Sequence, residues 1–125
     1  MLKNFRTFDL AVQLYRGCEQ IHTKPYLKDQ LMRASLSIVL NTSEGSAKPT
    51  AKDRRRFYGI ALGSCREVQA LLMLLKQDTL FQLSDQVGGC LYKLTHSHSL
   101  TQGPDRLQKR GRFPVSCCLT PLLFK

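Results

Sequence analysis

Residues 50–75, TAKDRRRFYGIALGSCREVQALLMLL, carry the strongest helical pattern of the chain. Thr50 followed by Asp53 has the form of a capping box, with a side-chain acceptor at the helix start and a carboxylate in the first turn. Beyond it, apolar or small residues recur at alternating steps of four and three, as in a helix packed at a shallow angle in a bundle. These positions are Phe57, Ala61, Ser64, Val68, Leu71 and Leu75. The pattern predicts one long helix beginning near residue 50.

Small residues are frequent within this predicted helix, at Gly59, Ala61, Gly63 and Ser64. A glycine inside a helix lowers its stability by roughly 1 kcal/mol relative to alanine. Because glycine occurs here twice in spite of that penalty, we expect a neighbouring helix to approach closely.

Two helical patterns precede this helix. The first ends at Pro25, and its apolar stripe consists of Phe8, Val12, Tyr15, Cys18 and Ile21. The second covers residues 27–43, and its stripe consists of Leu27, Leu31, Ala34, Ile38 and Asn41. Gly45 then supplies a helix stop, and Pro49 keeps the connection non-helical.

A fourth helix is predicted from near Ser84, with Gly88 and Gly89 weakening it. Its apolar positions are Val87, Leu91, Leu94 and His98. No alternating strand pattern of useful length occurs, so the fold class is all-α, an antiparallel four-helix bundle over residues 1–99.

Residues 100–125 differ from the rest. Gly103, Pro104, Gly111 and Pro114 interrupt any helix, basic residues are frequent, and the apolar stretch 115–124 has no period. We expect an irregular C-terminal tail that is poorly ordered or that docks only in an assembly.

The charge balance is strongly positive: 19 Lys and Arg against nine Asp and Glu give a net charge of +10, with an isoelectric point near 9.8. Such an excess favours polyanionic partners, either nucleic acid or an anionic membrane surface. The alternative is a generally basic surface without a dedicated partner. No export signal is evident, and the longest apolar run, residues 70–75, is too short to cross a bilayer. With five cysteines and no paired spacing, we expect reduced thiols and a cytoplasmic location.

The positive charge gathers at the entrance of the third predicted helix. Five basic residues lie within nine positions, offset only by Asp53: Lys48, Lys52, Arg54, Arg55 and Arg56. Arg66 follows about three turns after Arg55, close to the same face. Cations at a helix N-terminus oppose the macrodipole, and adjacent arginines repel one another. Phosphate groups would relieve both penalties, because arginine binds them through a bidentate fork.

The alternative for this cluster is a solvated helix face with some arginines paired to Glu44 or Asp53. No motif for base-specific reading is present, neither zinc-finger spacing nor an aromatic ribonucleoprotein motif. If nucleic acid binds here, we therefore expect backbone contacts that are weakly selective and strongly dependent on salt.

Several residues suggest chemistry but lack companions. Cys18 and His22 lie one turn apart, His96 and His98 face different sides of a helix, and Cys117 and Cys118 are adjacent. None of these pairs has a second ligand pair, so we expect no metal site. Glu44 and Glu67 are the carboxylates expected to be partly buried, yet no nucleophile, histidine or second acid accompanies them. We expect neither an active site nor a cofactor.

Two segments resemble a known family. Residues 33–45, RASLSIVLNTSEG, resemble a segment that ends in Asn-Ile-Ala-Glu-Gly in that family. Residues 57–64, FYGIALGS, followed by Glu67, resemble its second hallmark, Phe-Leu-X-Ile-Ala-X-Gly-Ser with a following Glu. The family is that of the four-helix bundle proteins encoded by intervening sequences of bacterial 23S ribosomal RNA genes, and the resemblance covers roughly residues 5–97. More distantly, the chain resembles the accessory variability determinant of diversity-generating retroelements.

The resemblance implies a bundle that assembles as a ring-shaped homopentamer with a basic surface able to bind RNA or DNA. In the retroelement relatives the ring also binds a reverse transcriptase, and no catalytic residues carry over. The hallmarks align with Asn41, Glu44, Gly45, Gly63 and Ser64. We interpret the first three as structural, shaping the turn between the second and third helices, with Glu44 capping or pairing there. Where the family often has proline this chain has Val39, so a less kinked helix is expected.

Two hypotheses for the function follow. The first is a non-catalytic oligomer that binds nucleic acid without sequence specificity through the basic cluster. The second is a protein–protein scaffold or accessory subunit, for example for a reverse transcriptase. An enzyme such as a nuclease is the distant third option.

Overall fold

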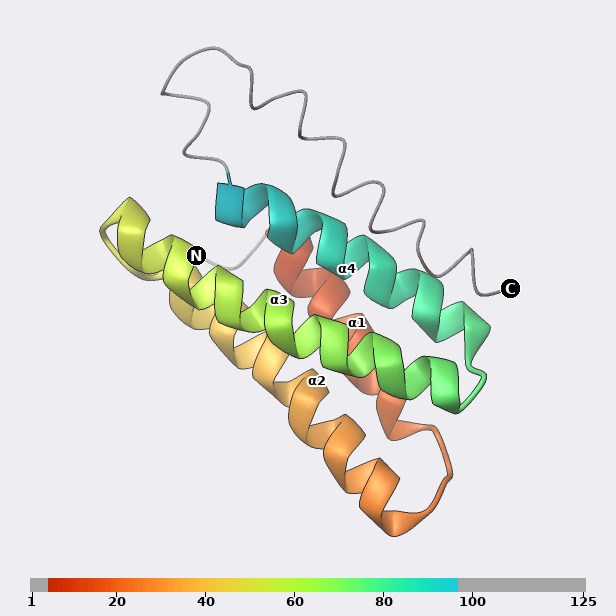
Figure 1. Cartoon of the computed structure of the whole chain (residues 1–125). Helices are drawn as coiled ribbons and strands as arrows, with labels where there is room; N and C mark the ends of the chain where they lie inside the picture. The colour runs from red at the N-terminus through yellow and green to blue at the C-terminus, as the bar shows by residue number, and fades with distance from the viewer. Residues whose placement is uncertain (1–4, 97–125) are drawn as a thin grey trace.

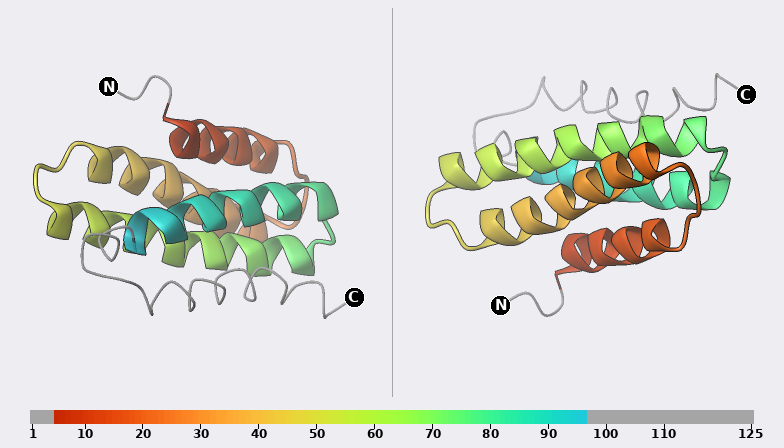
Figure 2. Two further views of the ribbon diagram at one scale, coloured as in Figure 1. Left: turned by 90° about the horizontal axis from the view of Figure 1, so that it is seen from above. Right: turned by 90° about the horizontal axis from the view of Figure 1, so that it is seen from below.

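Four α-helices make up most of residues 5–96, the part of the chain that the computed structural model describes (Figure 1). They are α1 (Arg6–Glu19), α2 (Pro25–Ser46), α3 (Ala51–Leu74) and α4 (Asp78–His96). The helix α1 packs on α2 and α4, and α3 packs on the same two helices, so the four enclose one core. Short connections make successive helices antiparallel (Figure 2). The predicted antiparallel four-helix bundle is confirmed, and the predicted tail, residues 100–125, lies outside the described residues.

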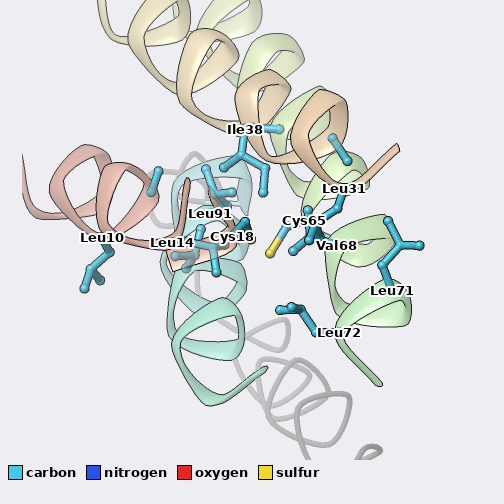
Figure 3. Close-up of a cluster of buried hydrophobic side chains, with 14 of the residues drawn as sticks. Leu10, Leu14, Cys18, Leu31, Ile38, Cys65, Val68, Leu71, Leu72 and Leu91 are labelled. Carbon is cyan, nitrogen blue, oxygen red and sulfur yellow. The ribbon is translucent and has the colours of Figure 1, made fainter. Parts of the chain in front are cut away.

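The core draws side chains from all four helices (Figure 3). The largest fully buried side chains are Leu14, Leu31, Ile38, Val68, Leu72, Val87 and Leu91. Most of them were predicted from the helical repeat. Burying an aliphatic side chain of this size stabilises the fold by about 1.5–3 kcal/mol, and such burial is what holds the bundle together.

Two predicted stripes match the observed core only in part. Cys18 and Ile21 of the first stripe are buried as predicted. In α1 the buried face runs through Leu10, Ala11 and Leu14, while Phe8 and Tyr15 are only half-buried at its margin. The predicted stripe of α1 was therefore wrong at these aromatic positions, as at Val12. In the predicted stripe of α3, Ala61, Val68 and Leu71 are buried as predicted, while Phe57, Ser64 and Leu75 are only half-buried. The stripe missed the buried residues Tyr58, Cys65 and Leu72. A bundle helix buries a face about 100° wide, and sequence spacing does not fix which edge of it is central.

The predicted helix boundaries need three corrections. Pro25 does not end α1 but begins α2, because proline lacks the N–H that the first turn leaves unpaired and has a helical φ. Gly45 does not stop α2, which continues to Ser46. The helix α4 begins at Asp78 rather than near Ser84 and runs through Gly88 and Gly89.

Gly45 lies within α2, at a point where α3 packs so closely that there is no room for a side chain. A Cβ built on Gly45 would lie 2.8 Å from Tyr58 Cε1 and 3.1 Å from Phe57 Cβ. The glycine therefore lets α3 approach α2 at this level, which is the close packing that we predicted for α3 itself. For Gly59 and Gly63 that prediction is wrong within residues 5–96, because no atom of this part lies within 4 Å of a Cβ built on either residue.

Candidate nucleic-acid interface

The entrance of α3 begins as predicted. The Thr50 hydroxyl accepts a hydrogen bond from the backbone N–H of Asp53 at 3.1 Å, and the Asp53 carboxylate lies in the first turn. The next three residues are Arg54, Arg55 and Arg56. Since successive residues of an α-helix are rotated by about 100°, the three arginines leave α3 in three directions. They therefore do not form one surface.

Arg54 holds the connection between α2 and α3. Its Nη1 donates to the carbonyl oxygens of Lys48 and Pro49, each at 3.0 Å, and its side chain is half-buried. These carbonyls lie just beyond the C-terminal end of α2, where the helix macrodipole favours a cation. Burial raises the pKa of the neighbouring Tyr58, and the charge of Arg54 opposes part of that rise. Arg54 is thus engaged by its own chain.

Arg56 and Lys48 both lie against the ring of Phe57. The Arg56 guanidinium carbon is 5.3 Å and the Lys48 ammonium 5.0 Å from the ring centroid, within the range of a cation–π interaction. Lys48 is also 3.7 Å from the carboxylate of Glu44, which neutralises part of its charge. Arg56 is exposed and keeps its charge available.

Arg55 and Arg66 lie on a common side of α3. Eleven residues separate them, which places them about 20° apart around the helix and roughly 16 Å apart along it. Arg66 donates to Oε1 of Gln69 at 3.2 Å, and Gln69 in turn donates to the Asp85 carboxylate of α4 at 3.3 Å. This side of α3 therefore faces the edge of α4. That the two arginines share a side was predicted from the sequence, but its position beside α4 was not.

The sequence also allowed some of these arginines to pair with Glu44 or Asp53, but no such ion pair forms within residues 5–96. Their salt bridges join Arg33 to Asp29 at 2.6 Å and Lys48 to Glu44 at 3.7 Å. No carboxylate of the described chain pairs with any of the three arginines at positions 54–56. Of the six predicted phosphate contacts, Arg54 is structural and Lys48 is partly neutralised, which leaves Lys52, Arg55, Arg56 and Arg66.

The hallmark residues join α2 to α3 rather than shaping the turn between them. Asn41 donates to the Ser37 carbonyl oxygen at 2.9 Å and to its hydroxyl at 3.1 Å, and that hydroxyl lies 2.8 Å from the hydroxyl of Ser64. Glu67 accepts a hydrogen bond from Gln30. Glu44 and Glu67 are both exposed, so the prediction that they are partly buried was wrong. Glu44 does pair near the turn, with Lys48.

The thiol of Cys18 is fully buried and hydrogen-bonded to Ser35, while His22 is exposed. Burial raises the pKa of Cys18 to about 11, although the charge of Lys28 and the bond to Ser35 oppose the rise. Such a thiol is a poor ligand and nucleophile near neutral pH. Within residues 5–96 no group of three or more His, Cys, Asp or Glu is placed to hold a metal ion. His98, Cys117 and Cys118 lie outside these residues.

Two features of the region were missed by sequence reasoning. The first is the ammonium of Lys28, which donates to the carbonyl oxygens of Glu19 at 2.7 Å and Ile21 at 2.6 Å and so closes the C-terminal end of α1. No local pattern indicates this contact, because it joins residues from different helices. The second is the role of Phe57 as a platform for two cations, which the adjacent Arg56 could have indicated.

None of the helices in the described part of the chain is long and apolar enough to cross a membrane. The fold and the charges together define a basic four-helix bundle with its densest positive charge at the entrance of the third helix.

Comparison with known families places this bundle more narrowly. The model of the family described as 23S rRNA-intervening sequence protein matches residues 5–96, and the chain belongs to this family. No curated protein and no solved structure matched the chain. The resemblance found in the sequence is thereby confirmed for the family, while the relation to retroelement proteins stays a prediction.

Proposed function

We propose that this protein is a non-catalytic, homo-oligomeric nucleic-acid-binding protein that contacts the backbone of RNA or DNA. The observation that carries the proposal is the set of cations along α3 that no carboxylate of the described chain neutralises: Lys52, Arg55, Arg56 and Arg66. Cations that repel one another and oppose the macrodipole weaken the free protein. A phosphate backbone removes both penalties and gains charge-assisted hydrogen bonds.

The binding mode follows from the arrangement of these cations. They lie on two sides of α3, with Arg55 and Arg66 toward α4 and Arg56 toward α2, so a backbone that crosses the outer surface of α3 could contact both sets. Arg54 supports the site by fixing the connection before α3. Because no base-reading motif accompanies these groups, affinity should depend on salt far more than on sequence. The family resemblance leads us to expect a homopentamer, which would repeat this surface around a ring.

The test compares two triple variants of the full chain. The first changes Lys52, Arg55 and Arg66 to Ala. The second is a control with the same loss of charge, made by changing the exposed Arg16, Lys24 and Lys93 to Ala. Binding to a labelled single-stranded RNA and to a DNA duplex is measured by fluorescence anisotropy at low salt.

We expect the first variant to lose at least about tenfold in affinity, equivalent to about 1.4 kcal/mol, and the control to lose much less. Equal losses in the two variants would mean that net charge, and not this surface, binds nucleic acid. Binding that neither variant changes would contradict the proposed site altogether.

The scaffold remains the second candidate, and it has its own supporting observation. Apolar side chains such as Leu40 and Ile60 are exposed on α2 and α3, as on a surface that another protein covers. Absence of any binding to RNA, single-stranded DNA and duplex at low salt would favour this candidate, with a reverse transcriptase as one partner to examine.

A further inference from the structure

The exposed apolar side chains are confined to one half of the bundle. Within residues 5–96 all the large ones lie on α2 or α3: Tyr26, Leu36, Leu40, Ile60, Met73 and Leu74. Isolated apolar residues are normal on protein surfaces, so their arrangement matters more than their number.

The helices α2 and α3 lie side by side (Figure 1), and the contacts between them fix their register. The two helices are antiparallel, with Ser37 beside Ser64 and Gly45 beside Phe57. This register places Leu40 level with Ile60. At the other end of the pair it places Tyr26 level with Leu74, whose exposed fractions are 66% and 71%.

Ile60, Gly63 and Leu74 also share one side of α3. At about 100° per residue they fall within roughly 60° of one another around the helix. This side of α3 borders α2, because Glu67 on the same side is hydrogen-bonded to Gln30. We call the surface formed by Tyr26, Leu36, Leu40, Ile60, Gly63 and Leu74 the α2/α3 face.

The glycines of α3 point to a partner outside the chain. Each glycine in the middle of a helix lowers stability by about 1 kcal/mol relative to alanine. Gly45 has a reason within the bundle, since Tyr58 fills the space where its side chain would be. Gly59 and Gly63 face open space within the described chain, so the packing of residues 5–96 gives no reason for them. A second helix lying across this part of α3 would require a small residue there.

The charges around the α2/α3 face indicate what kind of partner fits. The chain as a whole carries +10, but the charged groups that border this face are three acidic and three basic ones. They are Asp29, Arg33, Glu44, Lys48, Arg56 and Glu67. Four of them form two ion pairs and Glu67 is bonded to Gln30, while Arg56 lies against the Phe57 ring without a carboxylate partner in the described chain. A surface with balanced charge does not attract a polyanion. It does allow another strongly basic molecule to approach, and its interleaved acidic and basic groups can pair with those of an identical face.

We propose that the α2/α3 face is a contact between copies of this chain, with Leu40, Ile60 and Gly63 at its centre. The inference specifies the surface of the homo-oligomer in the proposed function and rests on that proposal. It leaves the side of α3 that carries Arg55 and Arg66 outside the contact, so that assembly repeats these two cations instead of covering them. Arg56 and Lys52 lie at the edge of the contact, one and two turns before Ile60.

The test measures self-association of the full chain by sedimentation velocity over a wide concentration range. Ile60→Glu and Leu40→Glu each place a charge in the contact, and we expect each to raise the dissociation constant at least about 30-fold. Met73→Glu is the matched control. Met73 lies on the same helix with 41% exposure against 43% for Ile60, but about 140° further around it. The control should assemble like the unmodified chain.

Gly63→Ala gives an independent measurement, because it should stabilise the protomer and weaken its self-association. The added methyl group meets no atom of residues 5–96 within 4 Å, so thermal unfolding of the protomer should shift to higher temperature. In the contact the same methyl group separates two helices, and the dissociation constant should rise. Retained helical circular dichroism in Ile60→Glu excludes unfolding as the cause of its loss of assembly.

Three results would overturn the proposal. They are a full chain that stays monomeric at every concentration, Ile60→Glu and Leu40→Glu proteins that assemble as well as Met73→Glu, and a Gly63→Ala protein that assembles more tightly. A monomeric chain that still binds nucleic acid contradicts the α2/α3 face and the homo-oligomeric part of the proposed function, and leaves the nucleic-acid binding standing. An assembly that dissociates in Ile60→Glu but never binds nucleic acid contradicts only the nucleic-acid function.

Discussion

Arg54 and Arg55 are neighbours in the sequence, yet alanine substitutions at the two positions should have different effects. Arg54 donates two hydrogen bonds of 3.0 Å to carbonyl oxygens in the α2–α3 connection. Hydrogen bonds to a charged group contribute about 1.5–3 kcal/mol when buried, and partial exposure of Arg54 reduces this. We therefore expect Arg54→Ala to lower the free energy of unfolding by about 1–2 kcal/mol. For a domain of this size, that corresponds to a fall in Tm of about 5–15 °C.

Arg55 has no carboxylate partner in the described chain, and alanine has a high helix propensity. Arg55→Ala should therefore leave the free energy of unfolding within about 0.5 kcal/mol of the original value. Its effect should appear in nucleic-acid affinity, as a loss of about threefold to tenfold and a shallower salt dependence.

The assay is urea unfolding followed by circular dichroism, together with anisotropy measurements on the same samples. Arg54→Lys is the matched control, because its ammonium keeps the charge and can restore one of the two hydrogen bonds. Equal stability of the Arg54→Ala and Arg55→Ala proteins would refute the distinction between a structural and a binding arginine. So would an Arg55→Ala protein that binds nucleic acid as tightly as the unmodified chain.

Three further predictions concern the bundle. The hydroxyl of Thr42 is fully buried without a hydrogen-bond partner in the described chain, so Thr42→Val should raise the free energy of unfolding by about 1 kcal/mol in urea titrations; a decrease would contradict this. Gly45→Ala should lower it by about 1–2 kcal/mol, because the clash with Tyr58 outweighs the gain in helix propensity, and an increase would show that Tyr58 can move aside. Since burial raises the pKa of Cys18 from 9.0 to about 11, the stability that its neutral thiol provides is fully present below pH 9 and is lost as the pH rises through 11. Thermal melts at pH 8 and above should therefore show a smaller loss of stability with rising pH for Cys18→Ala than for the unmodified chain. The same dependence of Tm on pH in both proteins would contradict this prediction.

The helical repeat was sufficient to predict the fold, because its signal is distributed over many residues. It predicted the number of helices and most of the core, including Leu31, Ile38, Val68 and Leu91. The cap at Thr50 was also predictable, since it depends on residues only three positions apart. Boundaries were less predictable where a packing contact outweighs local preference, as at Gly45, which remains helical against Tyr58.

In the candidate site, too, contacts set by local spacing were predictable and contacts between helices were not. Sequence spacing correctly placed Arg55 and Arg66 on one side of α3, because both lie on one regular helix. It could not show that Arg54 turns back to the connection before α3, or that Lys48 pairs with Glu44. Those contacts depend on the conformation of the connection between two helices, and a short connection has no repeating sequence pattern from which its conformation could be predicted. The cluster that looks uniform in the sequence is therefore divided in space into structural and available cations.

The salt dependence of nucleic-acid binding tests the central claim most directly. If Lys52, Arg55, Arg56 and Arg66 each neutralise one phosphate of a single strand, log K should fall with log salt concentration with a slope of about −3 for each bound protomer. The Lys52, Arg55 and Arg66 triple-alanine protein should retain a slope of only about −1. Affinity that does not change between about 50 and 200 mM salt, or equal slopes for the two proteins, would contradict a backbone-binding role for these cations.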